Sequence, residues 1–462
     1  MPSPAVGYLL DLLDGRRFPR PAGRAANLAR TERLLARLGD PQRDLPTVLI
    51  AGTKGKGSAA VMLGAMEAAA GRRIGLYTKP HLVDFRERIR INDDLVPEED
   101  LAGLVEELRP HIEAGRSDPE GAPTYFEAAV AAALLHFRRR QVDLAIVEVG
   151  LGGRLDPTNI CDPVLSVMMP ISYDHTEILG RTLAAIAHEK AGIIRPGRSL
   201  VSAPQPPEAA QILRALCAAS GARLVPVGDR VQWSHGTMTP AGQQVDLRGA
   251  AFYGRIDLPL VGRHQATNAA TAVAAAEELI ALGFPLPPEA VRRGLRAVRW
   301  PGRVEVVRTA PPVVIDVAHN VASMQALRDA LQEVWPGRRL ILVFGMVATH
   351  DHTAPAAVIA PLAEVVITTR PQHVRPLPPE VLAEAVRPYA PRVEAVEDRR
   401  AAVDRALSLA GPADLVCVTG SFYLAGDARM NLGAAPQEVP AGGAKHTPLP
   451  SPREGTSPAL GL

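Results

Sequence analysis

The chain has 462 residues, of which 47% are apolar and 22% are charged, and its net charge is +2. This balance is typical of a soluble globular protein with roughly two to four domains of about 100–200 residues each. The near-neutral charge predicts no nucleic-acid partner and no attraction to an anionic membrane, and no apolar stretch reaches the roughly 18 residues of a membrane span.

The N-terminus and the cysteines both favour a cytoplasmic location. The opening residues, MPSPAVGYLLDLLDGRRF, lack the basic region and long apolar run that mark a signal peptide. Cys161, Cys217 and Cys417 lie far apart and have no metal-type spacing. An odd number of cysteines without a secretory signal predicts reduced, buried thiols.

The first part of the chain alternates between strand-like and helix-like patterns. Strands rich in Val and Ile are predicted at 47–52, 143–150 and 163–169, and alanine-rich helices at 57–71 and 125–140. This alternation predicts a doubly wound α/β sheet. Ligands of such sheets bind at the carboxyl ends of the strands, where residues 51–58 and 148–156 fall.

A glycine- and lysine-rich loop follows the first strand. Its glycines let backbone amides approach an anion, Lys56 can neutralise a phosphate oxygen, and the Ser58 hydroxyl is placed to meet Mg²⁺. This loop differs in sequence from the common phosphate loop, G-x-x-x-x-G-K-[ST]. An ordinary strand-to-helix turn is therefore the alternative. The candidate nucleotide-binding residues are Gly52, Thr53, Gly55, Lys56, Gly57 and Ser58.

A second cluster, EVGLGGRLDPTN, begins where another strand ends. The carboxylate of Glu148 is a natural Mg²⁺ ligand beside a bound triphosphate, although it could equally cap a helix or pair with an arginine. The glycines that follow leave space for a ligand, and Arg154 and Asp156 are candidates to bind it.

A third cluster lies at 171–197. Asp174, His175 and Glu177 follow a strand, and Lys190 lies on a predicted helix. Ionisable groups that converge beside a phosphate loop favour a functional site, but their spacing alone assigns no roles.

A second α/β set follows the segment RWPGR, whose proline and glycine predict a hinge. Its strands are predicted within 312–320, 339–346, 364–370 and 414–421. From about residue 431 the composition is rich in Pro, Gly, Ser and Ala, which predicts a disordered tail. The predicted domains are therefore 1–298, 299–430 and the tail 431–462.

Motifs spread over roughly residues 45–430 resemble, in order, those of the folylpolyglutamate synthase/dihydrofolate synthase family, within the Mur ligase superfamily. The Mur-type loop has its lysine before the last glycine, as this chain does. The motifs that carry the resemblance are AGTKGKGS, YTKPHLVDFRERI, EVGLGGRLDPTN, ISYDHTEILG, HEKAGIIRPG, GRHQATNAATA, WPGRVE, DVAHN and GSFYLAGDAR.

The resemblance implies a P-loop-type mononucleotide-binding domain followed by a smaller Rossmann-like domain. It also implies an ADP-forming ligase, usually a monomer, in which ATP phosphorylates a carboxylate of the pterin substrate and the amine of L-glutamate displaces the phosphate. The expected substrates are dihydropteroate or reduced folates, L-glutamate and ATP. Closure of two domains suits this chemistry because it excludes water from the acyl phosphate.

The resemblance also assigns roles to particular residues. Ser58, Glu148 and His175 match Mg²⁺ ligands, and Lys190 matches a lysine that CO₂ carbamylates, which would let it support a second Mg²⁺. Lys56, Lys190 and His319 are the expected catalytic residues. At the nucleotide the matches are Asn268, Arg303, Asp316 and His319, and Ser421 matches a residue near the incoming glutamate. Arg154 and Asp156 match the pterin pocket, where loop-fixing salt bridges are an equal alternative.

One departure from the family concerns the metal site. The family usually has a serine before the proline of its TSPHL motif, with the hydroxyl beside the metal, whereas this chain has Lys79. A protonated lysine cannot coordinate Mg²⁺ but can meet phosphate directly. Two alternatives therefore stay open: a Mur-type ligase for a different carboxylate and amino acid, and a non-catalytic nucleotide-binding protein.

Overall fold

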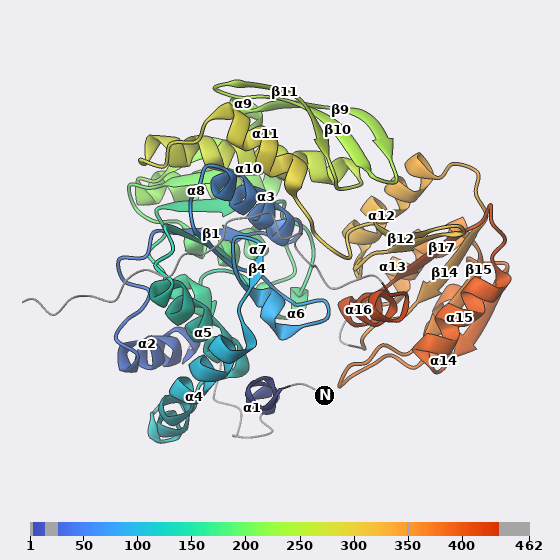
Figure 1. Cartoon of the computed structure of the whole chain (residues 1–462), viewed down its shortest axis with the longest axis horizontal. Helices are drawn as coiled ribbons and strands as arrows, with labels where there is room; N and C mark the ends of the chain where they lie inside the picture. The colour runs from blue at the N-terminus through green and yellow to red at the C-terminus, as the bar shows by residue number, and fades with distance from the viewer. Residues whose placement is uncertain (1–2, 14–25, 349–350, 434–462) are drawn as a thin grey trace, which may run out of the picture.

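The computed structural model describes residues 3–13, 26–348 and 351–433, which form two α/β units joined by a short connection. In Figure 1 the first unit, coloured blue to yellow, lies beside the smaller orange and red second unit. The predicted α/β architecture is confirmed, and every strand predicted from the sequence is present with small shifts at its ends.

The first unit is built on an eight-stranded sheet in the order β4-β3-β2-β5-β1-β6-β7-β8. The strands from β2 to β8 in this order run parallel, and β3 and β4 add an antiparallel edge. The bounds are β1 Thr47–Ala51, β2 Ile74–Tyr77, β3 Ile89–Ile91, β4 Asp94–Leu95, β5 Leu144–Glu148, β6 Leu165–Met168, β7 Ser199–Ser202 and β8 Arg223–Pro226.

Helices cover both faces of this sheet. Successive residues of a strand point to opposite faces, and both sets of side chains in the central strands are mostly apolar and buried. Leu49 and Ala51 of β1 pack into one apolar core and Val48 and Ile50 into another. Helices on the first face are α1 Pro4–Asp11, α2 Ala26–Arg37, α4 Glu98–Ala114, α5 Tyr125–Arg139, α7 Leu183–Lys190 and α8 Pro207–Ser220; those on the second are α3 Lys56–Ala69, α10 Arg263–Ala281 and α11 Pro288–Ala297. Two short helices are α6 Thr176–Leu179 and α9 Val227–Arg230.

A three-stranded antiparallel sheet, β9 Gln232–Thr239, β10 Gly242–Arg248 and β11 Phe252–Leu258, completes the second face. These strands are not among those predicted from the sequence. Val245, Leu247 and Ile256 alternate with polar residues and pack into the second core. Such half-buried strands carry a weaker apolar signal than the continuous runs of the parallel strands.

The second unit has a six-stranded sheet in the order β12-β13-β17-β14-β15-β16, in which only β12 runs antiparallel to its neighbour. Its strands are β12 Glu305–Thr309, β13 Pro312–Ile315, β14 Leu340–Phe344, β15 Ala363–Thr369, β16 Arg392–Val396 and β17 Leu415–Thr419. Its helices are α12 Val321–Val334, α13 Thr353–Ile359 and α14 Pro379–Val386 on one face, with α15 Arg399–Leu409 and α16 Phe422–Asn431 on the other.

The two units meet along several contacts. Arg263 at the start of α10 pairs with Glu333 of α12 at 2.9 Å. The carbonyl oxygen of Leu82 lies so close to α16 that a Cβ atom added to Gly426 would be 2.1 Å from it. The connection runs from α11, which ends at Ala297, to β12, and the domain limits given above remain a prediction. Of the predicted tail, residues 434–462 lie outside the described residues.

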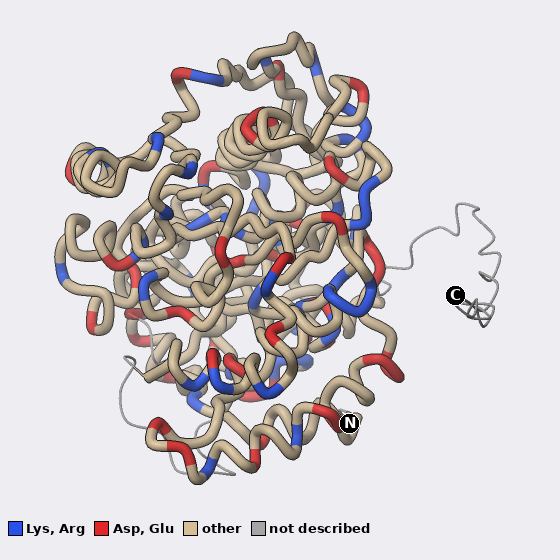
Figure 2. Tube along the Cα trace, turned by 90° about the vertical axis from the view of Figure 1, so that its left-hand side faces the viewer, with Lys and Arg blue, Asp and Glu red and all other residues tan. Residues whose placement is uncertain are grey.

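Charge is spread evenly over the molecule. Basic and acidic residues are interspersed along the trace in Figure 2, in keeping with the net charge of +2. Among the helices that the structure describes, none combines the length and the apolar character that a membrane crossing requires.

Candidate active site

The carboxyl ends of β5, β1 and β6 lie side by side, and the loops that leave them form a cavity of about 330 Å³. Segments of the second unit close it on one side, so the cavity lies between the two sheets. It brings together most of the predicted residues: Gly52, Thr53, Gly55, Lys56, Gly57, Ser58, Glu148, His175, Lys190, Arg303, His319 and Ser421.

The loop between β1 and α3 has the geometry of an anion site. Gly55 is the N-cap of α3 and has φ +81°, a left-handed conformation that favours glycine. A Cβ atom there would lie 2.4 Å from Asn268 Oδ1. The backbone amides of the first turn of α3 point out of the helix start, where an anion is stabilised. Asn268 lies against Gly55 and does not line the cavity.

Lys56 and Glu148 place opposite charges at the start of α3. Lys56 Nζ donates to the carbonyl of Thr53 at 3.3 Å and lies 3.9 Å from Glu148 Oε1. The other carboxylate oxygen of Glu148 accepts the backbone N–H of Lys79 at 3.1 Å. Burial raises the pKa of Glu148, an effect that Lys56 partly opposes, so this carboxylate gains from a nearby cation.

Lys190 ends α7 with its amine inside the protein. Its Nζ donates to the carbonyl of Gly52 at 2.9 Å, and the residue is 5% exposed. Burial and the charge of Lys56 lower the pKa of Lys190 to about 7. A substantial fraction of the amine is therefore neutral at physiological pH.

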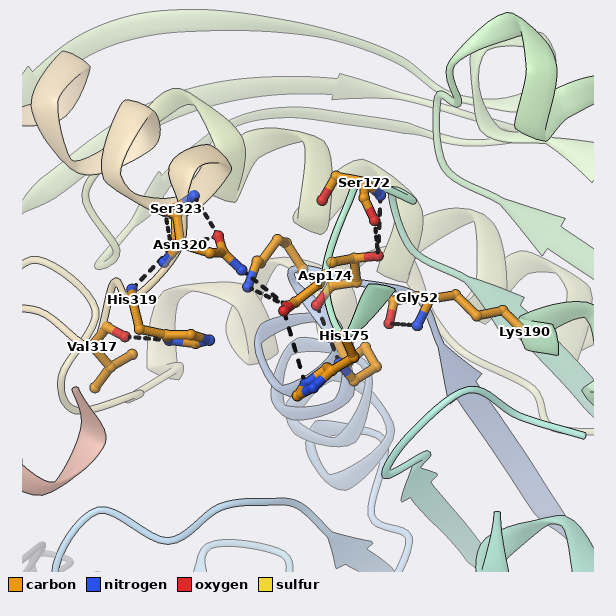
Figure 3. A network of polar contacts seen from close by, with 12 residues as sticks. Gly52, Ser172, Asp174, His175, Lys190, Val317, His319, Asn320 and Ser323 are labelled. Atoms are coloured by element: carbon orange, nitrogen blue, oxygen red, sulfur yellow. Dashed lines mark hydrogen bonds and ion pairs between the residues drawn. The ribbon is translucent and has the colours of Figure 1, made fainter. Parts of the chain in front are cut away.

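Asp174 connects the phosphate loop to the second unit, as Figure 3 shows. Its Oδ2 accepts from Lys54 Nζ at 3.1 Å and from Asn320 Nδ2 at 2.9 Å. Burial opposes ionisation, but the charges of Lys54, His175 and His319 outweigh it and lower the pKa of Asp174. The His175 ring lies 3.9 Å from the other carboxylate oxygen of Asp174.

The second unit contributes Arg303, His319 and Ser421 to the cavity wall. The Arg303 guanidinium lies 5.5 Å from the Trp300 ring centroid and 5.1 Å from that of Phe422, contacts that hold it over the cavity. His319 Nδ1 lies 2.9 Å from the carbonyl of Val317, and the Ser421 hydroxyl accepts the N–H of Leu424 as the cap of α16.

Asp316 lies behind this wall and does not line the cavity. Its carboxylate accepts the N–H of Val304 at 2.9 Å and that of Ala318 at 2.7 Å. Burial raises the pKa of Asp316 to about 6, against the opposing charge of Arg303. This aspartate therefore ties Val304, just before β12, to the loop that follows β13.

A second cavity of about 540 Å³ adjoins the first. Tyr77, Phe126 and Leu155 provide apolar walls, and Asp156 lies among them. Asp156 accepts the N–H of Leu151 at 2.7 Å and the hydroxyl of Thr158 at 2.6 Å, so it also fixes its own loop. The two cavities have in common Lys79, Phe126, Gly150, Leu151 and His175.

Arg154 lines neither cavity. Its guanidinium pairs with Glu189 at 2.6 Å, and its side chain is half exposed. This is the loop-fixing salt bridge that the sequence analysis gave as the alternative to ligand binding.

The described residues offer few side-chain donors to the predicted Mg²⁺ site. Among the described residues, no group of three or more His, Cys, Asp or Glu side chains is arranged to hold a metal ion. Mg²⁺ is usually bound through one or two carboxylates together with substrate phosphates rather than by a cage of side chains. The buried carboxylate of Glu148, beside Ser58 and the phosphate loop, fits such a nucleotide-bound ion.

Sequence reasoning missed several residues of this site. Arg88 lines the first cavity, donates Nε to His81 Nδ1 at 2.8 Å, and has a buried Nη1 with no hydrogen-bond partner among the described residues. In the sequence, Arg88 is marked by its place in the motif FRERI, as a charged residue between the buried Phe85 and Ile89. Asn320 lies in the motif DVAHN, but nothing local to α12 indicates its contact with Asp174.

Comparison with known proteins identifies the class of this fold and site. Residues 50–276 match the Mur ligase middle domain, and residues 302–422 match the Mur ligase glutamate ligase domain. The two matches correspond to the two α/β units, which together define a Mur-type ligase.

Similar full-length proteins narrow this class. The dihydrofolate synthase/folylpolyglutamate synthase of Bacillus subtilis is 38% identical, over 69% of this chain and 74% of that protein. The structure of Mycobacterium tuberculosis folylpolyglutamate synthase complexed with ADP has a TM-score of 0.85 at 35% identity, covering 94% of this chain and 100% of that one. The Escherichia coli FolC structure in complex with DHPP and ADP has a TM-score of 0.81 at 30% identity, covering 94% and 98%.

The chain belongs to the folylpolyglutamate synthase/dihydrofolate synthase family, which confirms the resemblance seen in the sequence. A probable bifunctional folylpolyglutamate synthase/dihydropteroate synthase of Haloferax volcanii is 37% identical over 92% of this chain. This chain spans half the length of that relative.

Proposed function

We propose that the protein is an ATP-dependent, ADP-forming ligase that couples the carboxylate of a pterin substrate to L-glutamate. The observation that carries this proposal is the junction of the two cavities, one built on a phosphate loop and one with aromatic and apolar walls. ADP and DHPP in the relatives' structures support it. Dihydropteroate or a reduced folate is the proposed acceptor.

In the proposed reaction, a carboxylate oxygen of the acceptor attacks the γ-phosphorus of ATP. The bond between that phosphorus and the β–γ bridging oxygen breaks, and ADP leaves. The glutamate amine, after losing one proton, attacks the acyl carbon, and phosphate departs with the electron pair of the C–O bond. The nitrogen then loses a second proton to give the amide.

Lys56 and the amides at the start of α3 are proposed to hold the phosphates, with Arg303 reaching them from the second unit. His319 and Ser421 line the opposite wall, where His319 is proposed to act at the nucleotide and Ser421 to meet the incoming glutamate. Asp316 acts through the backbone that it holds at Val304 and Ala318, and Asn268 is proposed to act through its packing against Gly55. Asp156 belongs to the pterin cavity, and Arg154 serves it by tying its loop to Glu189.

Magnesium would be held by Glu148, Ser58 and His175 together with phosphate oxygens, and it supplies charge neutralisation when bound. Lys190 is proposed to be carbamylated: its neutral amine attacks CO₂, a proton is released, and the side chain becomes an anion. The buried position of the amine and its pKa of about 7 support this step. The carbamate would add a negative ligand for a second Mg²⁺.

The proposal divides the chain into an ATP- and pterin-binding domain at 1–298 and a glutamate ligase domain at 299–430. A single chain supplies every residue to which the proposed reaction assigns a role, so we propose that the protein acts as a monomer. We also propose that it acts on small molecules and that it is cytoplasmic.

The test is ADP release measured with dihydropteroate and with tetrahydrofolate, each with and without L-glutamate. Release that needs both acceptor and glutamate is expected, and the preferred acceptor identifies the first substrate. No glutamate-dependent release with either acceptor contradicts the proposed function.

A further inference from the structure

Lys79 lies where the two cavities of the site meet. It follows β2, and its backbone N–H is tied to Glu148 Oε2, which sets the direction in which the side chain leaves the sheet. The ammonium lies above Gly150, because a Cβ atom added to that glycine would be 3.0 Å from Lys79 Nζ. It also lies 5.5 Å from the ring centroid of Phe126, on the wall that both cavities share.

This ammonium makes no hydrogen bond or ion pair of its own with the residues that the structure describes. The nearest carboxylates already have other donors: Asp156 accepts from Leu151 and Thr158, and Glu148 accepts the backbone of Lys79 itself. A lysine ammonium has three donors, and a partly buried one without a hydrogen-bond acceptor is costly. Its surroundings therefore favour an incoming anion.

The position of the ammonium restricts which anion this is. A substrate whose rings fill the second cavity would bring its carboxylate to the phosphate loop along the shared wall, on which Lys79 lies with Gly150 and Phe126. A side chain at Gly150 would displace both Asp156 and Lys79, since its Cβ would lie 2.6 Å from Asp156 Oδ2 and 3.0 Å from Lys79 Nζ. The glycine thus leaves room for the Lys79 ammonium at the junction of the two cavities.

We infer that Lys79 binds the reacting carboxylate of the acceptor and holds it against the terminal phosphate of ATP. This inference rests on the proposed function and names the residue that receives the acceptor. Two anions must approach each other for phosphoryl transfer, and a fixed cation between them offsets their repulsion. An aliphatic side chain of similar length at position 79 would leave the carboxylate unpaired at the junction.

The test compares the binding of dihydropteroate and of its carboxamide analogue to wild type, Lys79→Met and Lys79→Arg, by calorimetry in the presence of ADP. Wild type is expected to bind the carboxylate more tightly than the carboxamide by roughly 10- to 100-fold, the usual range for a hydrogen bond to a charged group. Lys79→Met should lose that preference while binding the carboxamide as wild type does, and Lys79→Arg should keep part of it. Arg248→Met, which removes an exposed cation from β10, should match wild type.

Equal binding of the two ligands by wild type overturns the inference, even if the Lys79→Met protein does not fold. An unchanged preference in Lys79→Met overturns it too, as does an equal loss for both ligands, which would indicate a packing role. The proposed function is separated from this inference by turnover: wild type that releases no ADP contradicts the function, whereas active wild type without the carboxylate preference contradicts only the role of Lys79.

Discussion

Asn320 donates its side-chain N–H to the carboxylate of Asp174 at 2.9 Å, and so links α12 of the second unit to the loop after β6 of the first. The same oxygen of Asp174 accepts Lys54 Nζ from the phosphate loop. Asn320 is at the same time the N-cap of α12, because its Oδ1 accepts the N–H of Ser323. The start of α12 is therefore connected, through Asp174, to the phosphate loop of the first unit.

Asn320→Asp tests this link, since aspartate retains the cap oxygen but places a carboxylate against Asp174. Repulsion between the two carboxylates should separate the units and raise the KM for glutamate by about 10-fold, with little change in thermal stability. Steady-state kinetics and small-angle scattering measure both effects. Arg263→Gln, which removes the exposed pair with Glu333, should change little. If Asn320→Asp has the same KM for glutamate and the same scattering curve as wild type, the link is refuted.

Lys190→Ala should abolish turnover, and short carboxylates such as acetate or propionate should restore part of it by replacing the carbamate. In wild type, burial holds the pKa of Lys190 near 7, so roughly a tenth of the amine is neutral at pH 6 and most of it at pH 8. Only the neutral amine reacts with CO₂. Activity should therefore fall in CO₂-depleted buffer, more severely at pH 6 than at pH 8, and return with bicarbonate. Full activity of Lys190→Ala excludes the carbamate.

Glu148→Gln should separate metal binding from nucleotide binding. The amide keeps the size of the side chain but loses its negative charge, so the gain in ADP affinity on adding Mg²⁺ should shrink by at least about 10-fold. ADP affinity in EDTA should stay near that of wild type, because Lys56 and the amides of α3 are unchanged. Calorimetry with and without Mg²⁺ gives both values, and a wild-type response to Mg²⁺ would show that Glu148 is not a ligand.

Gly55→Ala should destabilise the phosphate loop for two reasons, its φ of +81° and the contact of an added Cβ with Asn268. We expect a loss of about 1–3 kcal/mol in unfolding free energy together with weaker ADP binding. Gly71→Ala is the matched control, because Gly71 has φ +92° but nothing within 4 Å of its Cβ position. It should lose stability through φ alone and keep ADP affinity. Equal effects of the two variants would mean that the space beside Asn268 is unimportant.

The phosphate loop and Glu148 could be predicted from the sequence because each belongs to a local pattern, a strand followed by its loop. Parallel strands then bring those loops to one edge of the sheet, so convergence follows from fold class alone. Lys190 required the family resemblance, since a lysine on a helix carries no local mark of burial.

The remaining features depend on contacts between distant segments, which no local pattern encodes. The position of Lys79 beside Gly150 depends on how β2 lies next to β5, and the pairing of Arg154 with Glu189 on how one loop meets α7. Asn268 and Asp316 matched nucleotide-binding positions in sequence, but both lie behind the cavity wall. Their distance from the cavity could be seen only in the folded chain.

The most direct test of the account follows oxygen from substrate to product. Dihydropteroate, or whichever pterin acceptor proves active, is labelled with ¹⁸O in its carboxylate and converted with ATP and L-glutamate, and the released phosphate is analysed by mass spectrometry. Activation as an acyl phosphate predicts one ¹⁸O atom in each phosphate, because the carboxylate oxygen that attacks ATP leaves with the phosphorus. Phosphate free of ¹⁸O, at full conversion to the glutamate adduct, would contradict the proposed mechanism.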